Sequence, residues 1–217
     1  MLKIEHFDVW DIAAVANIDG KKEVGFGQYS AVVDNNNGTV SVISACPAKK
    51  ALLLDNDVRA TSLIQLPEVI AAKKIDEIEF TRPDYSIREI HKHRLKFELF
   101  EYIIPKYKKM YTRDLKPEQI NIISQLEEQI NSRDWNIVTG KKPIKIEQPD
   151  DLINIFFEEL AQVIQDAKLT LDYYYPDNFM LDDNNKIILL DPVWSGRFAN
   201  AINFLSVDLD QIERLGF

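Results

Sequence analysis

The stretch that decides the fold is PDNFMLDDNNKIILLDP, residues 176–192. Two short apolar runs, Phe179 to Leu181 and Lys186 to Leu190, flank a turn of Asp and Asn residues, which predicts a β-hairpin. Asn178 precedes the first run and Asp191 follows the second, 13 residues later. Because a hairpin returns the chain to its starting point, we expect these two side chains to converge.

An amide oxygen and a carboxylate that converge in this way form a hard oxygen site of the kind that Mg²⁺ prefers, with phosphate oxygens completing the shell. Asn178 and Asp191 are therefore the predicted metal ligands. Asn and Asp at hairpin ends also cap turns in many proteins, so the spacing alone leaves both interpretations open.

The residues before this hairpin are expected to form strands first and helices later. Asn35 to Gly38 is a turn signal between two extended segments, Tyr29 to Asp34 and Thr39 to Ser44, which predicts a second hairpin. A helix is expected over Asp55 to Gln65, ended by Pro67. Further strands are expected over Glu68 to Ala72 and over Leu95 to Phe100.

Two amphipathic helices are predicted in the second half of the chain. One begins at Pro117, with a stripe of Ile120, Ile123, Leu126 and Ile130. The other covers Leu152 to Ala167 and is capped by Asp150. Its expected inward residues are Leu152, Ile155, Phe156, Leu160, Val163 and Ile164. Strands followed by helices and a terminal hairpin predict an α+β protein with two segregated lobes.

A glycine-containing segment, Gly25-Phe26-Gly27-Gln28-Tyr29-Ser30, lies between two predicted strands. Dinucleotide-binding folds place such glycines between a strand and a helix, so that class is disfavoured. A glycine turn that joins two strands can instead lie over the phosphates of a nucleotide and offer backbone N–H groups.

These segments together resemble the protein-kinase-like superfamily. Residues 25–33, GFGQYSAVV, resemble its glycine-rich loop, while residues 175–181 and 189–192 resemble its catalytic loop and metal-binding Asp. The resemblance is closest to small bacteriophage-type serine/threonine kinases and aminoglycoside-phosphotransferase-like kinases, where Asp-Pro can replace Asp-Phe-Gly. It implies one kinase-like domain over residues 1–217, with a β-rich N-lobe of about 1–101 and a small helical C-lobe of about 104–217.

The resemblance also implies ATP and Mg²⁺ as cofactors. Asn178 and Asp191 would hold the metal, and residues Glu101 to Ile103 would form the hinge that joins the lobes. The helix from Leu152 to Ala167 would lead into the catalytic loop. The residues implied in nucleotide binding are Gly25, Gly27, Tyr29, Glu101 and Ile103.

Two catalytic residues of that superfamily are missing at their expected positions. Ser41 or Val42 stands where the third strand should carry the phosphate-binding Lys, although Lys49 and Lys50 follow shortly. Five residues before Asn178, where the general base belongs, stands Tyr173. A neutral Tyr, with an unperturbed pKa of about 10, is a poor proton acceptor near neutral pH. Asp172, one residue further away, is therefore the candidate catalytic base.

Three functions follow from this mixture of retained and missing residues. The first is a pseudokinase, or a weakly active atypical kinase, that binds ATP and Mg²⁺. The second is an active atypical serine/threonine kinase or nucleotidyl transferase that uses Asp172 with a relocated Lys. The third is a non-enzymatic inhibitor or effector that binds a protein partner. Only 26 residues follow Asp191, so the usual protein-substrate platform is expected to be absent, or replaced by residues 102–149.

The composition excludes several other classes of protein. A net charge of −9 disfavours binding to nucleic acid or to an anionic membrane. A single cysteine, Cys46, excludes an internal disulfide framework. No window reaches the roughly 20 apolar residues of a membrane-spanning helix, and Met1 to Ile18 lacks the apolar core of a signal peptide. We expect a cytoplasmic protein, or one exported by a route that reads no N-terminal signal. The Lys-, Asn-, Ile- and Asp-rich composition suits a bacterial or phage gene.

Overall fold

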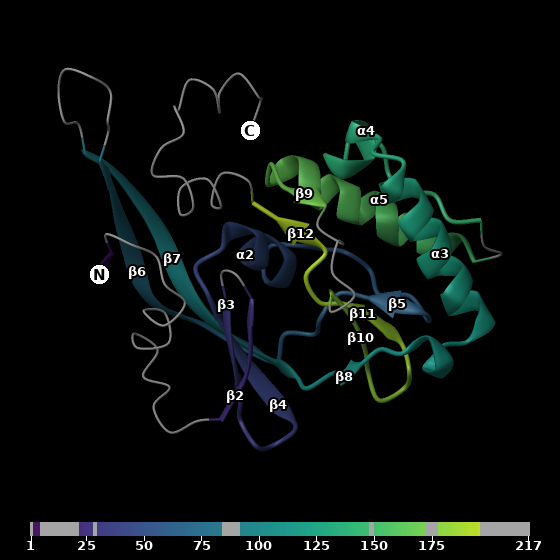
Figure 1. Ribbon diagram of the computed structural model, residues 1–217, viewed down its shortest axis with the longest axis horizontal. Coiled ribbons are helices and arrows are strands. Elements are labelled where there is room, and N and C mark those ends of the chain that lie inside the picture. Colours follow the sequence, from purple (N-terminus) through teal and green to yellow (C-terminus); the bar gives the residue numbers. More distant parts are fainter. Residues whose placement is uncertain are drawn as a thin grey trace. The chain divides into compact units, whose positions relative to one another are not determined.

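The computed structural model describes residues 2–4, 22–27, 30–83, 92–147, 150–171 and 178–195. Within them the protein is α+β, as predicted, with long strands before Pro105 and the longer helices after it (Figure 1). The chain divides into two compact units. The first comprises the described parts of Met1–Lys50, Val69–Pro105 and Ser195–Phe217, and the second comprises those of Ala51–Glu68 and Lys106–Trp194.

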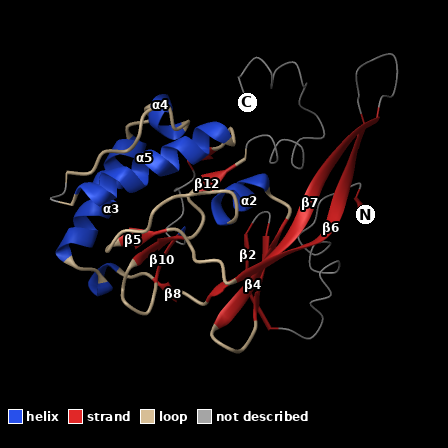
Figure 2. Cartoon of the chain, turned by 180° about the vertical axis from the view of Figure 1, so that it is seen from behind, coloured by secondary structure: helices blue, strands red, loops and turns tan. Residues whose placement is uncertain are grey.

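The first unit is built on a six-stranded sheet, which includes the labelled strands β2, β4, β6 and β7 in Figure 2. β1 runs parallel to β6, and the other neighbouring strands are antiparallel. In spatial order the strands are β1 (Leu2–Ile4), β6 (Ala71–Pro83), β7 (Lys92–Pro105), β4 (Thr39–Ser44), β3 (Ser30–Asp34) and β2 (Lys22–Gly27). The predicted strands over Glu68 to Ala72 and Leu95 to Phe100 belong to β6 and β7, which begin and end at different residues from those expected.

The turn between β3 and β4 confirms the predicted hairpin. Asn36 and Gly38 have φ values of 58° and 82°, in the left-handed region that Asn and Gly tolerate best. The Asn36 N–H donates to the Asp34 carboxylate at 2.8 Å. Beneath this turn the core of the unit is formed by fully buried side chains, among them Val33, Ile43, Ile78, Leu99 and Tyr102.

The predicted helix over Asp55 to Gln65 is wrong, because the helix lies earlier, as α2 (Pro47–Leu53). Pro47 is suited to the first position of a helix. After α2, short polar side chains bind the backbone and compete with helix formation. The Asn56 carboxamide oxygen accepts from the Val58 N–H at 3.0 Å, and Thr61 Oγ1 accepts from the N–H of Ile64 at 2.9 Å. The segment ends in a two-residue strand, β5 (Ile64–Gln65).

The second unit contains the longer helices and two small sheets. Its helices are α3 (Pro117–Asn131), α4 (Trp135–Val138) and α5 (Asp151–Asp166), preceded by a 3₁₀ turn at Thr112–Asp114. One sheet has the order β5, β11 (Ile187–Leu189), β10 (Phe179–Leu181) and β8 (Lys108–Lys109). The other sheet pairs β12 (Val193–Trp194) with β9 (Thr170–Leu171).

The two predicted helices of this unit are confirmed, but their buried faces differ from the prediction. Asp150 caps α5, its carboxylate accepting from the Leu152 N–H at 2.9 Å. Leu152 itself is 51% exposed, whereas Ile153 and Phe157 are buried. Apolar residues cover a wide arc of α5, so their spacing does not fix which part of the arc packs inward. In α3, Ile122 replaces Ile120 and Ile123 on the buried face.

Candidate metal site at the end of a hairpin

β10 and β11 form the predicted hairpin that carries the candidate metal ligands. Phe179 pairs with Leu189 in an antiparallel register. Just beyond that pair, the Leu190 N–H donates to the Asn178 carbonyl at 2.9 Å. The backbone of Asn178 is therefore held opposite Leu190, one residue before Asp191. Both Asn178 and Asp191 are partly exposed.

The acidic residues at the opposite end of the hairpin are used by the turn. The Asp182 carboxylate accepts from the N–H groups of Asn184 and Lys186, both at 2.8 Å. Asp183 pairs with Lys108 at 2.8 Å, and the hydrogen bond from that lysine lowers the pKa of the Asp183 carboxyl. This is the turn chemistry expected of Asp and Asn at such positions.

Two buried or bridging amides fix the hairpin to its surroundings. Gln119, only 1% exposed, donates from Nε2 to the Asn185 carbonyl at 2.6 Å. Its Oε1 accepts from the Lys116 N–H at 2.9 Å, which ties the start of α3 to the hairpin turn. Lys186 Nζ donates to Gln65 Oε1 at 3.0 Å on the β5 side. The burial of Gln119 was not predicted, because a single Gln in an amphipathic helix is usually exposed.

The second small sheet connects the strand that follows Asp191 with the strand that ends just before Asp172. β12 follows Asp191 almost directly, and its Val193 pairs with Leu171 of β9. Leu171 directly precedes Asp172, and Asn178 is the next residue that the structure describes. Asp172 and Tyr173 themselves lie outside the described residues. Both neighbours of that segment, Leu171 and Asn178, are thus hydrogen-bonded or paired to residues within two positions of Asp191.

A packed apolar layer supports the candidate site from below. Asn178 and Pro192 border a void of about 10 Å³ together with apolar side chains such as Phe157, Leu160 and Leu189. This volume is about the minimum that one water molecule needs, so the void has no room for a ligand. Asn178 and Pro192 are therefore packed against an apolar layer that contains little empty space.

The donor set at the hairpin suits a metal that arrives with a ligand. Asn178 and Asp191 offer one amide and one carboxylate, and Mg²⁺ commonly keeps waters and substrate phosphates in the rest of its shell. Among the described residues no group of three or more His, Cys, Asp and Glu side chains is arranged to hold a metal. The pair is thus suited to Mg²⁺ with a phosphate ligand rather than to a closed structural site.

The two glycines of the predicted phosphate-covering turn fall inside a strand rather than in the turn between two strands. Gly25 and Gly27 lie in β2 and pair with Val32 and Ser30 of β3, and the register shifts between Glu23 and Gly25. Tyr29 lies outside the described residues. These two glycines belong to the first unit, whereas Asn178 and Asp191 belong to the second.

β4, the strand on which the kinase resemblance implies a phosphate-binding Lys, carries uncharged side chains at the two candidate positions. Ser41 is 1% exposed and donates from Oγ to Asn35 Oδ1 at 3.1 Å. Val42 is 5% exposed and pairs with Val32 and Tyr102. Neither side chain supplies the positive charge that would bind phosphates.

The residues of the predicted hinge lie inside a strand. Glu101 and Ile103 lie inside β7, paired with β4 on one side and with β6 on the other. Glu101 is 9% exposed and forms an ion pair with Lys73 at 2.6 Å. The strand continues to Pro105, which cannot donate a further ladder hydrogen bond, and the chain passes there from the first unit to the second. Nucleotide binding by Glu101 and Ile103 stays a prediction.

The two lysines after the third strand have different surroundings. Lys50 pairs with Glu98 at 2.7 Å and lies over the Phe100 ring at 5.3 Å. Hydrogen bonds from Lys50 and Lys74 lower the pKa of the Glu98 carboxyl. Lys49, the residue before Lys50 in α2, is only 8% exposed. Adjacent identical residues gave no sequence signal that one is buried and the other is not.

Comparison with known proteins adds no relative. No protein-family model matches the chain, and no curated protein matches it. The kinase resemblance therefore depends on the residues of this chain alone.

None of the helices in the described part of the chain is long and apolar enough to cross a membrane. This finding agrees with the absence of a long apolar window in the sequence.

Proposed function

We propose that this chain is a pseudokinase or weakly active atypical kinase with a two-lobed, kinase-like fold, and that it binds Mg²⁺ and ATP through Asn178 and Asp191. The observation that carries the proposal is the end of the β10–β11 hairpin. There, Asn178 is held opposite Leu190, and the β9–β12 pairing places Leu171 beside Val193. The candidate ligands Asn178 and Asp191 thus stand at the end of this hairpin, and Leu171, the residue before the candidate base, is paired with a residue two positions after Asp191.

The order of elements supports the kinase interpretation. The glycine-containing hairpin β2–β3 is followed by β4, and β7, which lies next to β4, directly precedes the passage into the second unit after Pro105. In the second unit α5 leads to β9 and then to the segment before Asn178. These are the successions that the resemblance implies for the glycine-rich loop, the third strand, the linking strand and the catalytic loop.

Weak phosphotransfer follows from the residues that are missing. A Lys on the third strand and a base five residues before the metal-binding Asn would stabilise the charge and the proton transfer in the transition state. Ser41, Val42 and Tyr173 stand in those positions. Loss of both groups removes several kcal/mol of transition-state stabilisation, and every 1.4 kcal/mol or so is a tenfold loss in rate.

Binding of nucleotide to the hairpin is tested by thermal-shift titration with Mg–ATP. We expect Mg–ATP to raise the melting temperature, and ATP with EDTA to leave it unchanged. Asp191→Asn and Asn178→Ala should each weaken the apparent affinity by about tenfold or more, because each removes a metal ligand. Asp183→Asn, which alters the exposed carboxylate at the other end of the same hairpin, is the matched control and should bind normally.

Two results would contradict this proposal. Binding that survives both ligand substitutions would place the nucleotide elsewhere. A complete lack of binding to any nucleotide with any divalent metal would favour the third candidate, a non-enzymatic inhibitor or effector.

One observation favours a second candidate function, an active atypical kinase or nucleotidyl transferase. A buried lysine is uncommon because removing its charge from water is costly, and Lys49 is 8% exposed. Lys49 lies in α2, which follows β4 closely. In this candidate Lys49 supplies the phosphate-binding charge that the third strand lacks.

The adjacent lysines form their own control pair. If Lys49 binds phosphate, Lys49→Met should abolish transfer of labelled γ-phosphate from ATP, to the chain itself or to a generic acceptor, and Lys50→Met should leave transfer nearly intact. Both variants should be compared by their melting temperatures, since Lys49 is buried. Equal activities of the two folded variants, or no transfer by the wild type, would reject this second candidate.

A further inference from the structure

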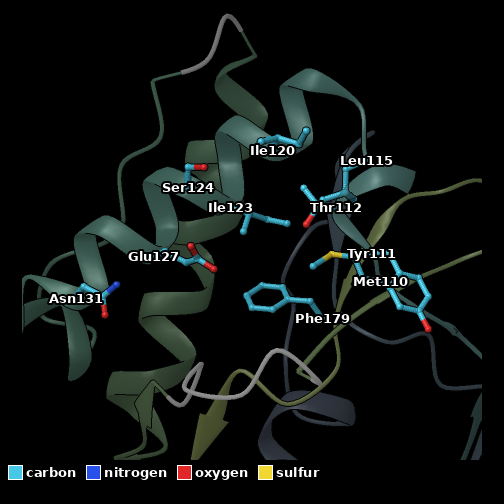
Figure 3. A pocket seen from close by; sticks show the side chains of 10 residues that line it. All are labelled: Met110, Tyr111, Thr112, Leu115, Ile120, Ile123, Ser124, Glu127, Asn131 and Phe179. Atoms are coloured by element: carbon cyan, nitrogen blue, oxygen red, sulfur yellow. The ribbon is translucent and has the colours of Figure 1, made fainter.

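A groove of about 680 Å³ lies along α3 in the second unit (Figure 3). α3 forms one wall, the segment of residues 110–115 forms the other, and Phe179 of β10 lies at the base. Its apolar lining consists of Met110, Tyr111, Leu115, Ile120, Ile123 and Phe179. The groove plays no part in the proposed metal site, although Phe179 directly follows Asn178.

Its apolar lining is not explained by packing within the unit. α3 already buries one apolar face, formed by Ile122, Leu126 and Ile130. Ile120, on the groove side, remains 38% exposed, and Tyr111 on the opposite wall is 49% exposed. Exposed apolar area costs about 25 cal/mol per Å² relative to burial, and contiguous apolar patches usually mark interaction sites.

The charge of the groove selects among possible occupants. Among the described residues of the lining, only Glu127 is charged at neutral pH, and it points from α3 toward the Phe179 ring (Figure 3). Arg113, which lies over the Tyr111 ring at 5.1 Å, is itself paired with Asp114 at 3.9 Å. An anionic occupant such as a nucleotide would therefore meet a like charge, whereas a cation flanked by apolar groups would be complementary.

The length of the groove fits a short peptide segment. Ile120 and Asn131 both line it and are separated by 11 residues of α3, about 16 Å at the helical rise of 1.5 Å per residue. This is about three turns of a helix or five residues of an extended chain. A second copy of this chain is less suitable, because each copy carries a net charge of −9.

We infer that this groove binds a segment of a partner protein that combines two or three large apolar side chains with a Lys or Arg. The apolar side chains fill the space between Ile120, Tyr111 and Phe179, and the basic side chain pairs with Glu127. The groove is thus a docking surface for a basic, amphipathic segment, as in the helix-in-groove mode of recognition.

The inference is tested with a displayed library of random peptides about three helical turns long, selected on the full-length protein. We expect selected peptides to combine apolar residues at helical spacing with Lys or Arg, and their affinities to be measurable by fluorescence anisotropy. Ile120→Asp should weaken binding by about tenfold or more, as loss of an anchoring apolar contact does. Leu152→Asp, which changes an exposed leucine on α5, is the matched control and should leave binding unchanged.

A charge exchange tests the role of Glu127. Glu127→Lys should weaken binding of the selected peptides, and changing their basic residue to Glu should restore it. Tyr111→Asp, on the opposite wall, provides a second test should Ile120→Asp fail to fold. Selection of acidic peptides would overturn the inference, as would peptides whose affinity is unchanged by both Ile120→Asp and Tyr111→Asp. Self-association of the wild type that Ile120→Asp abolishes would also overturn it. Mg–ATP titration of Ile120→Asp separates this result from the proposed function, because the metal site should remain intact.

Discussion

At the scale of single residues, the proposed function depends most on which residue before Asn178, Asp172 or Tyr173, acts as the catalytic base. Leu171 is fixed by its pairing with Val193, and Asp172 follows it directly. Tyr173 stands at the position that the kinase resemblance assigns to the base. A carboxylate with an ordinary pKa near 4 accepts a proton at neutral pH far better than a phenol does.

We therefore expect Asp172→Asn to abolish any phosphotransfer that the wild type shows, while Tyr173→Phe leaves most of it. The measurement is the rate of γ-phosphate transfer from ATP, with Mg–ATP affinity determined in parallel. Affinity should change little in either variant, because neither residue is a predicted metal ligand. The opposite order of activities would assign the base to Tyr173.

At the scale of elements, the packing of the segment after α4 against α5 depends on one glycine. Gly140 follows α4 with a φ of 72° and is buried. A Cβ at this position would lie 2.5 Å from the Ala161 carbonyl oxygen and 3.0 Å from Ile164. Gly38, in the turn between β3 and β4, has a similar φ of 82° but no atom within 4 Å of a Cβ.

These two glycines separate backbone strain from steric exclusion. Gly38→Ala should lower the free energy of unfolding by about 1 kcal/mol, the cost of a left-handed conformation. Gly140→Ala should lower it by about 3 kcal/mol or more, because the helix backbone must also move. Urea denaturation of both variants measures the difference. Equal losses would mean that α5 shifts freely away from Gly140.

The helices and strands could be predicted from the sequence where local chemistry determines them. Pro117 and Asp150 marked two helix starts correctly, since both act within a single turn. The buried faces were less predictable, because Ile120 and Leu152 look like core residues by spacing and are exposed. Pairs as short as β9 and β12 leave no periodic pattern at all.

The candidate site could likewise be predicted only where a local sequence pattern determines it. The hairpin that carries Asn178 and Asp191 followed from turn residues and apolar runs. The full length of β7 did not follow from the local pattern, because the strand continues past Glu101 and Ile103 to Pro105. The burial of Lys49 and the bridging role of Gln119 depend on tertiary contacts, which a local pattern does not encode.

At the scale of the whole molecule, ligand binding should be visible as stabilisation of the second unit. A ligand that binds only the folded protein contributes about 2.7 kcal/mol at a concentration of one hundred times its Kd. For a protein of this size, this is roughly a rise of 5 to 10 °C in melting temperature. Asn178 and Asp191 both belong to the second unit.

Scanning calorimetry with and without Mg–ATP tests this expectation. If the units unfold in separate transitions, Mg–ATP should raise the one that Gly140→Ala lowers, because Gly140 and the metal ligands share a unit. The transition that Gly38→Ala lowers should move less. A rise confined to the latter transition would contradict the assignment of the metal site.

The interleaving of the two units along the chain has a consequence for how the protein can be divided. β5 belongs to the second unit, where it runs parallel to β11, yet it precedes β6 and β7 of the first unit in sequence. Cutting the backbone between Pro105 and Lys106 would give a C-terminal fragment whose strand β11 has lost its neighbour β5. Such a fragment exposes a bare strand edge and is prone to aggregate alone. The two halves should therefore be recovered in folded form only when they are produced together, as a complementing pair.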